Sequence, residues 1–193
     1  MNCFCSVRTY SYLCGRFINF KVLKIMKKNL LWMMALVLTC GLMSACSSDD
    51  DKSDSKTTLI EVIYTTNVSD DLLKVADLKM VYYDETGAKK EEAVTSKDWQ
   101  KSIKLTKVPA KAGSYLKATP KSSIAEGSYA LDVTALVSVA GTLANGKSFA
   151  ESNGEVSSAT KQAAEVADFC NHLDGTTITI DAEGNKTIGK FDK

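Results

Sequence analysis

Cys170 and His172 form the most reactive pair of side chains in this sequence. A thiol two residues from an imidazole suggests thiol–imidazole catalysis or metal binding. However, residues 158–173 repeat apolar side chains at helical spacing, and two steps along a helix turn the direction of a side chain by about 200°. We therefore predict that Cys170 faces the core as a structural thiol and that His172 points away, beside Asp168.

Clusters of carboxylates are the other candidates for site chemistry. Asp70 and Asp71 in NVSDDLLKV predict a loop or a capped short turn, with a cation site as the alternative. The turn DAEGN, which starts at Asp181, lacks the ligand spacing of a calcium loop. With no nucleophile–base pair and no cluster of metal-ligating residues in view, the sequence predicts no enzyme, no metal site and no cofactor.

Cys46, in the motif LMSAC, suggests chemistry of a different kind. A Lys-Lys pair precedes an apolar stretch of 14 residues, Leu30–Met43, and two small residues stand directly before the cysteine. A basic start, an apolar middle and small residues at the cleavage point are the parts of an export signal. A thiol at the first mature position can accept a diacylglycerol. We therefore predict a lipoprotein signal peptide over residues 26–45 and acylation of Cys46, for example by palmitate.

The alternative for this stretch is a transmembrane helix. Its 14 apolar residues fall short of the roughly 20 needed to cross a bilayer, and an acidic run follows them where a stop-transfer segment would be basic. Residues 1–25 show neither clear periodicity nor a motif. Because a signal peptide that begins at Met26 needs nothing in front of it, we expect that the start codon has been assigned too far upstream.

Residues 46–56 predict a flexible acidic tether behind the lipidated cysteine. SSDDDKSDSK holds no apolar side chain, and ten such residues reach on the order of 17 Å. Asp49, Asp50 and Asp51 resemble the export signal of surface-exposed lipoproteins in Bacteroidetes-type bacteria, and a solvated linker is the alternative. We therefore expect an outer-membrane protein that is anchored by lipid and exposed at the cell surface, with a periplasm-facing protein as the alternative.

The chain from Cys46 onward is acidic and contains no arginine. Residues 1–45 hold six of the 24 basic residues and none of the 23 acidic ones, so 18 lysines oppose 23 carboxylates for a net charge of −5. An acidic surface without guanidinium groups argues against nucleic acid as a partner. Cys170 is the one free thiol after the predicted cut, so an intrachain disulfide is excluded there.

Alternating apolar residues predict strands from residue 57 onward. The pattern is clear in TLIEVIYTTN, in DLKMVYY and at the odd positions of residues 129–139, and Asn145-Gly146 predicts a type I′ hairpin turn. Short strands between turns predict a mainly β fold, an antiparallel two-sheet sandwich of immunoglobulin or transthyretin type. We expect a single domain over residues 57–193, with one C-terminal helix at 158–173 and a terminal hairpin.

Two aromatic residues are candidates for ligand contact. Tyr82 and Tyr83 are adjacent, so they must face opposite sides of their strand. We predict that Tyr83 faces solvent and that, with Trp99, it can stack on a ligand such as a sugar. The alternative is that these rings only cover their neighbours on the sheet.

The pattern from MKKNLLWMMALVLTCGLMSAC through NVSDDLLKVADLKMVYYDETG resembles small uncharacterised lipoproteins of gut Bacteroidetes that carry β-sandwich domains. The resemblance covers residues 57–155 of the domain. It implies an envelope-anchored binding or structural module, held on the bilayer through Cys46, with a glycan or a protein as the ligand. The alternatives are an accessory glycan-binding lipoprotein and a pilus-type structural subunit. Such pilus subunits mature by cleavage after arginine, and no arginine follows Arg16.

Overall fold

The computed structural model describes residues 57–193. The predicted signal peptide (26–45), the segment before it (1–25) and the tether (46–56) lie outside the described residues. So do Cys46 and the three aspartates Asp49, Asp50 and Asp51.

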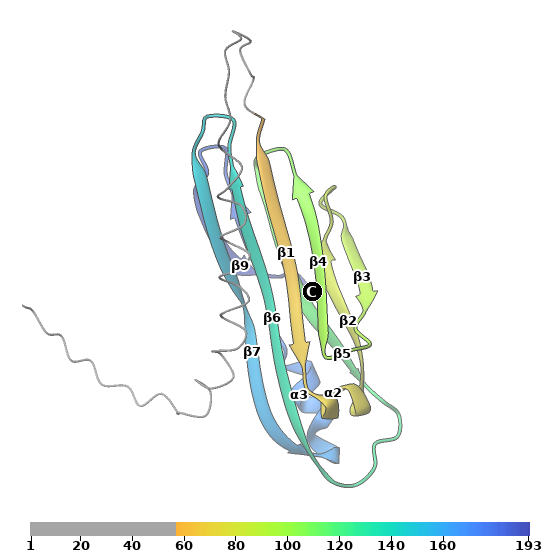
Figure 1. Cartoon of the computed structure of the whole chain (residues 1–193). Helices are drawn as coiled ribbons and strands as arrows, with labels where there is room; N and C mark the ends of the chain where they lie inside the picture. The colour runs from red at the N-terminus through yellow and green to blue at the C-terminus, as the bar shows by residue number, and fades with distance from the viewer. Residues whose placement is uncertain (1–56) are drawn as a thin grey trace, which may run out of the picture. The chain divides into compact units, whose positions relative to one another are not determined.

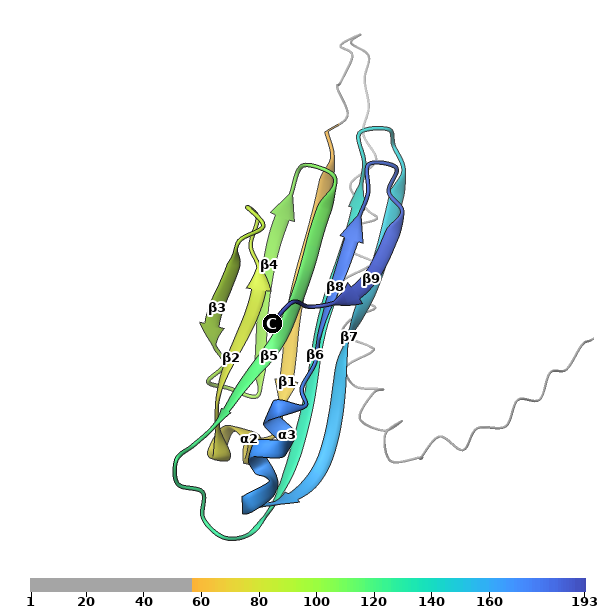
Figure 2. The same ribbon diagram turned by 180° about the vertical axis from the view of Figure 1, so that it is seen from behind.

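Two antiparallel sheets lie face to face, which confirms the predicted β-sandwich (Figures 1 and 2). One sheet has the strand order β4-β1-β6-β7 and the other has the order β3-β2-β5-β8-β9. The strands are β1 (Leu59–Val68), β2 (Ala76–Tyr83), β3 (Lys89–Ala93), β4 (Asp98–Leu105), β5 (Ala110–Pro120), β6 (Ser128–Thr142), β7 (Ser148–Gln162), β8 (Gly175–Ile180) and β9 (Lys186–Lys190).

The central strands follow the period of two that their sequences predict. In β1 the even positions from Ile60 to Val68 are buried, and in β6 the odd positions from Leu131 to Val139 are buried. Because successive side chains of a strand point to opposite faces, each strand buries one apolar row between the sheets. The core forms two clusters, one of which includes Leu72, Leu116 and Phe169 and the other Ile60, Val137 and Ile178.

Three hairpins share one turn geometry. In the turn after β6, Gly146 N donates to Leu143 O at 2.8 Å and Leu143 N donates to Lys147 O at 2.9 Å, with Gly146 at φ 85°. Residues 84–88 and 181–185 repeat these two hydrogen bonds, and Gly87 and Gly184 also have positive φ. This is the three-residue loop with a left-handed glycine at its end. The prediction of a two-residue type I′ turn at Asn145-Gly146 is therefore wrong, because the loop is one residue longer.

The predicted helix at 158–173 is wrong in its first part. Residues up to Gln162 continue β7, where they pair with the start of β6, and the helical segment consists of η1 (Ala163–Glu165) and α3 (Val166–Asn171). Ala159 fits both patterns, because it faces inward in the strand and also falls on the apolar stripe of a helix. The serines and Thr160 around it have poor helix propensity, so the ladder with β6 determines the outcome.

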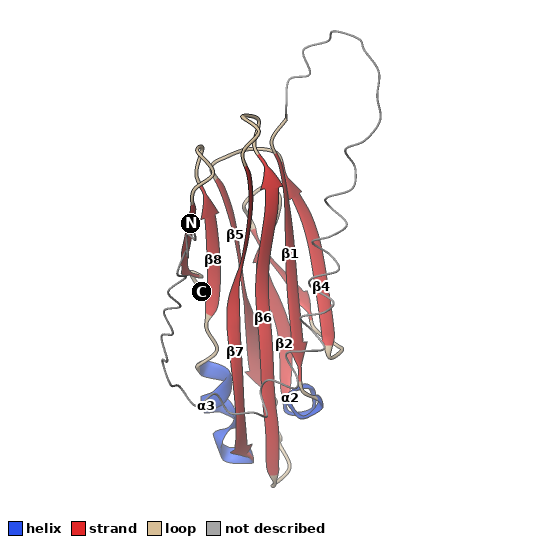
Figure 3. Ribbon diagram, turned by 60° about the vertical axis from the view of Figure 1, so that its left-hand side comes forward, coloured by secondary structure: helices blue, strands red, loops and turns tan. Residues whose placement is uncertain are grey.

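The loops of the domain gather at two opposite ends (Figures 1 and 3). The start of β1, the turns at 143–147 and 181–185 and the connection from β4 to β5 lie at one end. At the other end lie α2 (Asp70–Val75), α3 and the connection from β5 to β6. Residue 57, where the predicted tether would join the domain, therefore lies opposite the helical end.

Candidate functional site

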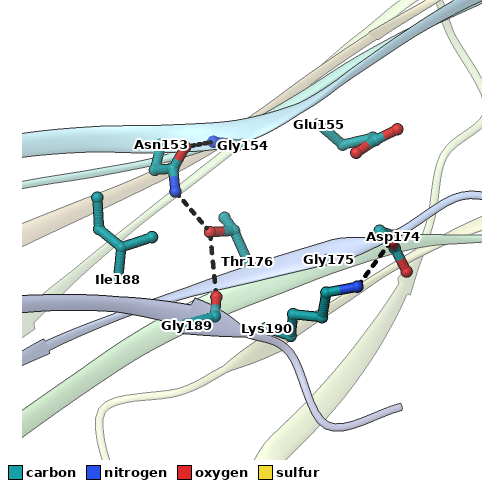
Figure 4. Close-up of a pocket in the computed structure, with 9 residues that line it drawn as sticks. All are labelled: Asn153, Gly154, Glu155, Asp174, Gly175, Thr176, Ile188, Gly189 and Lys190. Atoms are coloured by element: carbon teal, nitrogen blue, oxygen red, sulfur yellow. Dashed lines mark hydrogen bonds and ion pairs between the residues drawn. The ribbon is translucent and has the colours of Figure 1, made fainter.

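A polar groove lies where edge strand β7 faces β8 and β9 of the other sheet (Figure 4). Its volume is about 370 Å³. Strand β7 contributes the polar side chains of Asn153 and Glu155, and β9 contributes Lys190. Thr176 comes from β8, and Asp174 directly precedes that strand. Ile188, half exposed, is the apolar side chain at its wall.

Polar contacts hold the two sheets together across this groove. Asn153 Nδ2 donates to Thr176 Oγ1 at 3.1 Å, and Thr176 Oγ1 donates to Gly189 O at 3.5 Å. Nearer the turns, Lys186 of β9 forms an ion pair with Glu151 of β7 at 3.2 Å. At this side of the sandwich the two sheets are therefore joined by hydrogen bonds and an ion pair, whereas apolar packing joins them in the core.

The inner face of β7 is the source of this polarity. The residues of β7 that pair with buried positions of β6 include Glu151, Asn153, Glu155 and Ser157, so charged and polar groups point toward the space between the sheets. The outward positions from Ser148 to Gln162 carry no charge. This pattern is the reverse of an ordinary surface strand, which buries its apolar side and exposes its polar side.

Glycine brings the backbone close at the groove. A Cβ on Gly154 would collide with Ala135 O of β6, and a Cβ on Gly175 would collide with the side chains of Tyr115 and Phe191. The lack of a side chain therefore lets β7 approach β6 closely at Gly154 and lets Tyr115 and Phe191 pack on Gly175, and both glycines line the groove with backbone atoms alone.

The charges of the groove are unequally paired. Asp174 contacts Lys193 at 3.3 Å and Lys190 at 3.4 Å, and these two ammonium groups lower the pKa of its carboxyl. The Glu155 carboxylate has no hydrogen-bond or ion-pair partner within residues 57–193. The groove therefore offers one unpaired carboxylate and glycine backbone, which suit the binding of a polar or extended chain.

Tyr83 is buried, so the prediction that it faces solvent is wrong. Its side chain lies on the outer face of the five-stranded sheet, but Phe191 from the end of the chain covers it, with ring centroids 4.8 Å apart. Tyr115 packs on the other side of Phe191 at 5.2 Å, and Lys111 Nζ lies 4.7 Å from the Tyr83 ring centroid. A strand pattern alone gives no sign that the C-terminal residues fold back over this face.

Trp99 is half buried on β4 and does not meet Tyr83. Its ring packs against Tyr82 at 5.8 Å, and the Tyr82 hydroxyl donates to Glu92 Oε1. Glu92 also pairs with Lys101 of β4 at 2.8 Å, which closes the edge opposite the groove. The two predicted ligand-contact residues thus lie in separate clusters, and Trp99 takes part in packing between the sheets.

Cys170 and His172 diverge as the helical spacing predicts. Cys170 is buried, and burial raises the pKa of its thiol. His172 is exposed, and its Nδ1 lies 3.2 Å from Asp168 Oδ1 and 2.7 Å from Asp168 O. The prediction of a buried thiol and an outward imidazole is confirmed.

The carboxylates of the two acidic loops already have hydrogen-bond or ion-pair partners. Ser69 caps α2 by accepting from Leu72 N, Asp70 pairs with Lys97 at 2.7 Å, and Asp71 pairs with Lys74 at 3.0 Å. This arrangement confirms the predicted capped short turn. Asp181 accepts from Asn185 N at 2.7 Å and from Glu183 N at 3.0 Å, so it shapes its own turn.

Comparisons with known proteins add no family to this picture. No protein-family model, curated protein or solved structure matches the chain. In residues 57–193, no group of three or more histidine, cysteine or acidic side chains is placed to hold a metal ion. Over the same residues, no helix has the length and apolar character that a membrane crossing requires.

The sequence did not predict the groove, although it contains one sign of it. Charges recur on the odd positions of 151–161, the same parity that faces the core in the neighbouring strand. This alternation of charges is recognisable only if residues 158–162 form a strand, whereas the sequence predicts a helix there.

Proposed function

We propose that the protein is an envelope-anchored lipoprotein whose β-sandwich serves as a binding or structural module. The observation that carries this proposal is the direct succession of three parts along the chain. LMSAC predicts acylation of Cys46, a polar segment without apolar residues follows, and a sandwich with its own core begins at Leu59.

The geometry of the domain supports a presenting role. The first described residue lies at the end of the sandwich that carries the turns 143–147 and 181–185. A lipid anchor before residue 57 would therefore hold this end toward the bilayer and the helical end away from it. The groove lies along the side, where a partner can approach without contact with the membrane.

A protein ligand fits the described surface better than a glycan does. Sugar-binding faces use exposed aromatic rings, and in residues 57–193 every aromatic side chain is buried or half buried. The groove instead offers backbone and one unpaired carboxylate, which suit an extended polypeptide. We therefore place the glycan-binding alternative second. The pilus-type alternative has no specific contact in its favour.

Acylation and topology together test this proposal. The chain should incorporate an alkyne fatty acid in a bacterial host that processes lipoproteins, and Cys46→Ala should abolish the label and release the domain from the membrane fraction. Protease treatment of intact cells should remove the wild-type domain. Replacement of Asp49, Asp50 and Asp51 by alanine should protect it. A wild-type protein without label would refute the anchor, and equal resistance of both forms to protease would refute surface exposure.

A further inference from the structure

Edge strand β7 presents every second backbone unit to solvent. The backbone N–H and C=O groups of its odd residues face β6, because the hydrogen bonds at the two ends of this hairpin, Leu143 N to Lys147 O and Ala163 N to Gly127 O, join odd residues. In β6 the backbone groups of the even residues point toward β1. Asp132 shows this, because its N–H donates to Ser69 Oγ and its C=O accepts from Ser69 N, and Ser69 directly follows β1. The N–H and C=O groups of the even residues of β7 therefore point away from the sheet.

Side chains already occupy both ends of this edge. Glu151 Oε1 accepts from Ser152 N at 3.3 Å, and Asn153 Oδ1 accepts from Gly154 N at 2.9 Å. Lys186 Nζ donates to Ala150 O at 2.9 Å.

At the far end, Glu165 Oε2 accepts from Gln162 N at 2.9 Å. These contacts blunt the edge in the manner that natural proteins use against unwanted strand pairing.

A window from Val156 to Thr160 lacks such protection. The edge-facing backbone groups of Val156, Ser158 and Thr160 have no partner among the described residues. Their side chains are exposed and uncharged, and Val156 is 66% exposed. No proline interrupts β7, which at 15 residues is the longest of the four edge strands.

We propose that this window pairs with the same window of a second copy of the chain. The two β7 strands run antiparallel about a two-fold axis at Ser158, so Val156 lies opposite Thr160 of the second copy. The two four-stranded sheets then become one continuous eight-stranded sheet. This inference goes beyond the proposed function and does not depend on acylation of Cys46.

Charge selects this register. With the axis at Ser158, Glu155 lies directly opposite Lys161 of the second copy, and the symmetry repeats the pair. Within residues 57–193 the Glu155 carboxylate has no partner, and the Lys161 ammonium group pairs only with Asp168, at 3.8 Å. Opposite charges at directly opposed positions stabilise a pair of strands.

Neighbouring registers are worse. An axis at Val156 needs the N–H groups of Ser152 and Gly154, which side chains already occupy. An axis at Thr160 pairs Ser158 with Gln162 of the second copy, and the Gln162 N–H already donates to the Glu165 carboxylate. Because a two-fold pairing uses the window of both copies, the assembly closes at two chains and does not extend into a fibre.

Cysteine cross-linking of the full chain in its host membrane tests the register. Directly opposed residues whose backbones exchange hydrogen bonds lie about 5.5 Å apart at Cα, within the range a disulfide can bridge. Ser158→Cys should therefore yield a disulfide-linked dimer on mild oxidation, above the background of the wild-type cysteines. Ser152→Cys lies on the same face of the same strand but away from the axis, and it is the matched control.

Charge reversal separates a specific pairing from random collision. In the Ser158→Cys background, Glu155→Lys or Lys161→Glu alone should lower the dimer yield by roughly tenfold, because each places like charges together twice. The double reversal should restore the yield. Equal yields from Ser158→Cys and Ser152→Cys, or a double reversal that stays monomeric, would overturn the proposal.

Discussion

Replacement of Phe191 by alanine tests the role of the chain end in covering the outer face of the five-stranded sheet. Phe191 is 4% exposed, packs between Tyr83 and Tyr115, and donates its N–H to Gly175 O at 3.0 Å. Phenylalanine-to-alanine changes in cores cost about 3–5 kcal/mol. The space left here opens to solvent, so we expect the lower end, about 3 kcal/mol. For a domain of this size that loss lowers the thermal midpoint by roughly 10 °C.

The assay is thermal unfolding, followed by circular dichroism, of the chain that begins at Ser47. Ile188→Ala is the control, because Ile188 lies on the neighbouring strand β9 but is 51% exposed, and its loss should leave the midpoint nearly unchanged. A Phe191→Ala midpoint equal to that of Ile188→Ala would show that the C-terminal residues do not cover Tyr83.

Three further predictions follow from buried or strained groups. Cys170 should resist a thiol reagent in the native state and react after denaturation, since it is buried with a raised pKa; fast native labelling would contradict this. Gly184→Ala should destabilise the fold by about 1–2 kcal/mol in denaturant titrations, because its φ of 77° is left-handed, whereas Ala182→Gly in the same turn should cost less. Hydrogen bonds from Thr86 lower the pKa of Asp84 below its ordinary 3.8, and backbone and side-chain hydrogen bonds from Asn185 likewise lower that of Asp181. The stability that these carboxylates provide is thus complete above about pH 5, where they are ionised in both states, and is lost as the pH falls through their folded pKa values. The midpoint should be steady from pH 7 to 5 and fall below about 4, and a midpoint that rises with acid would refute the assignment.

Sequence patterns predict the strands that bury one apolar row. The even positions of β1 and the odd positions of β6 alternate without interruption, so burial and secondary structure agree there. The capped turn at Ser69 and the inward thiol of Cys170 are also local, because spacing along a single element determines them.

Features that depend on contacts between distant segments could not be predicted in this way. Tyr83 is buried because Phe191 returns to it from more than a hundred residues away, and the groove exists because Asn153 of β7 meets Thr176 of β8. In residues 158–162 the sequence fits two periods, and only the pairing of β7 with β6 decides between them. Tertiary contact therefore overrides local preference at these positions.

Mass spectrometry of the N-terminal peptide tests the central proposal most directly. The chain should be isolated from the membrane fraction of a lipoprotein-processing host, and the peptide that contains Cys46 should be identified by its fragments. We expect a mature chain that begins at Cys46 and carries a diacylglycerol on the thiol, with a further acyl group on the new amino terminus. An N-terminal peptide that runs through an unmodified Cys46 would contradict the lipid anchor.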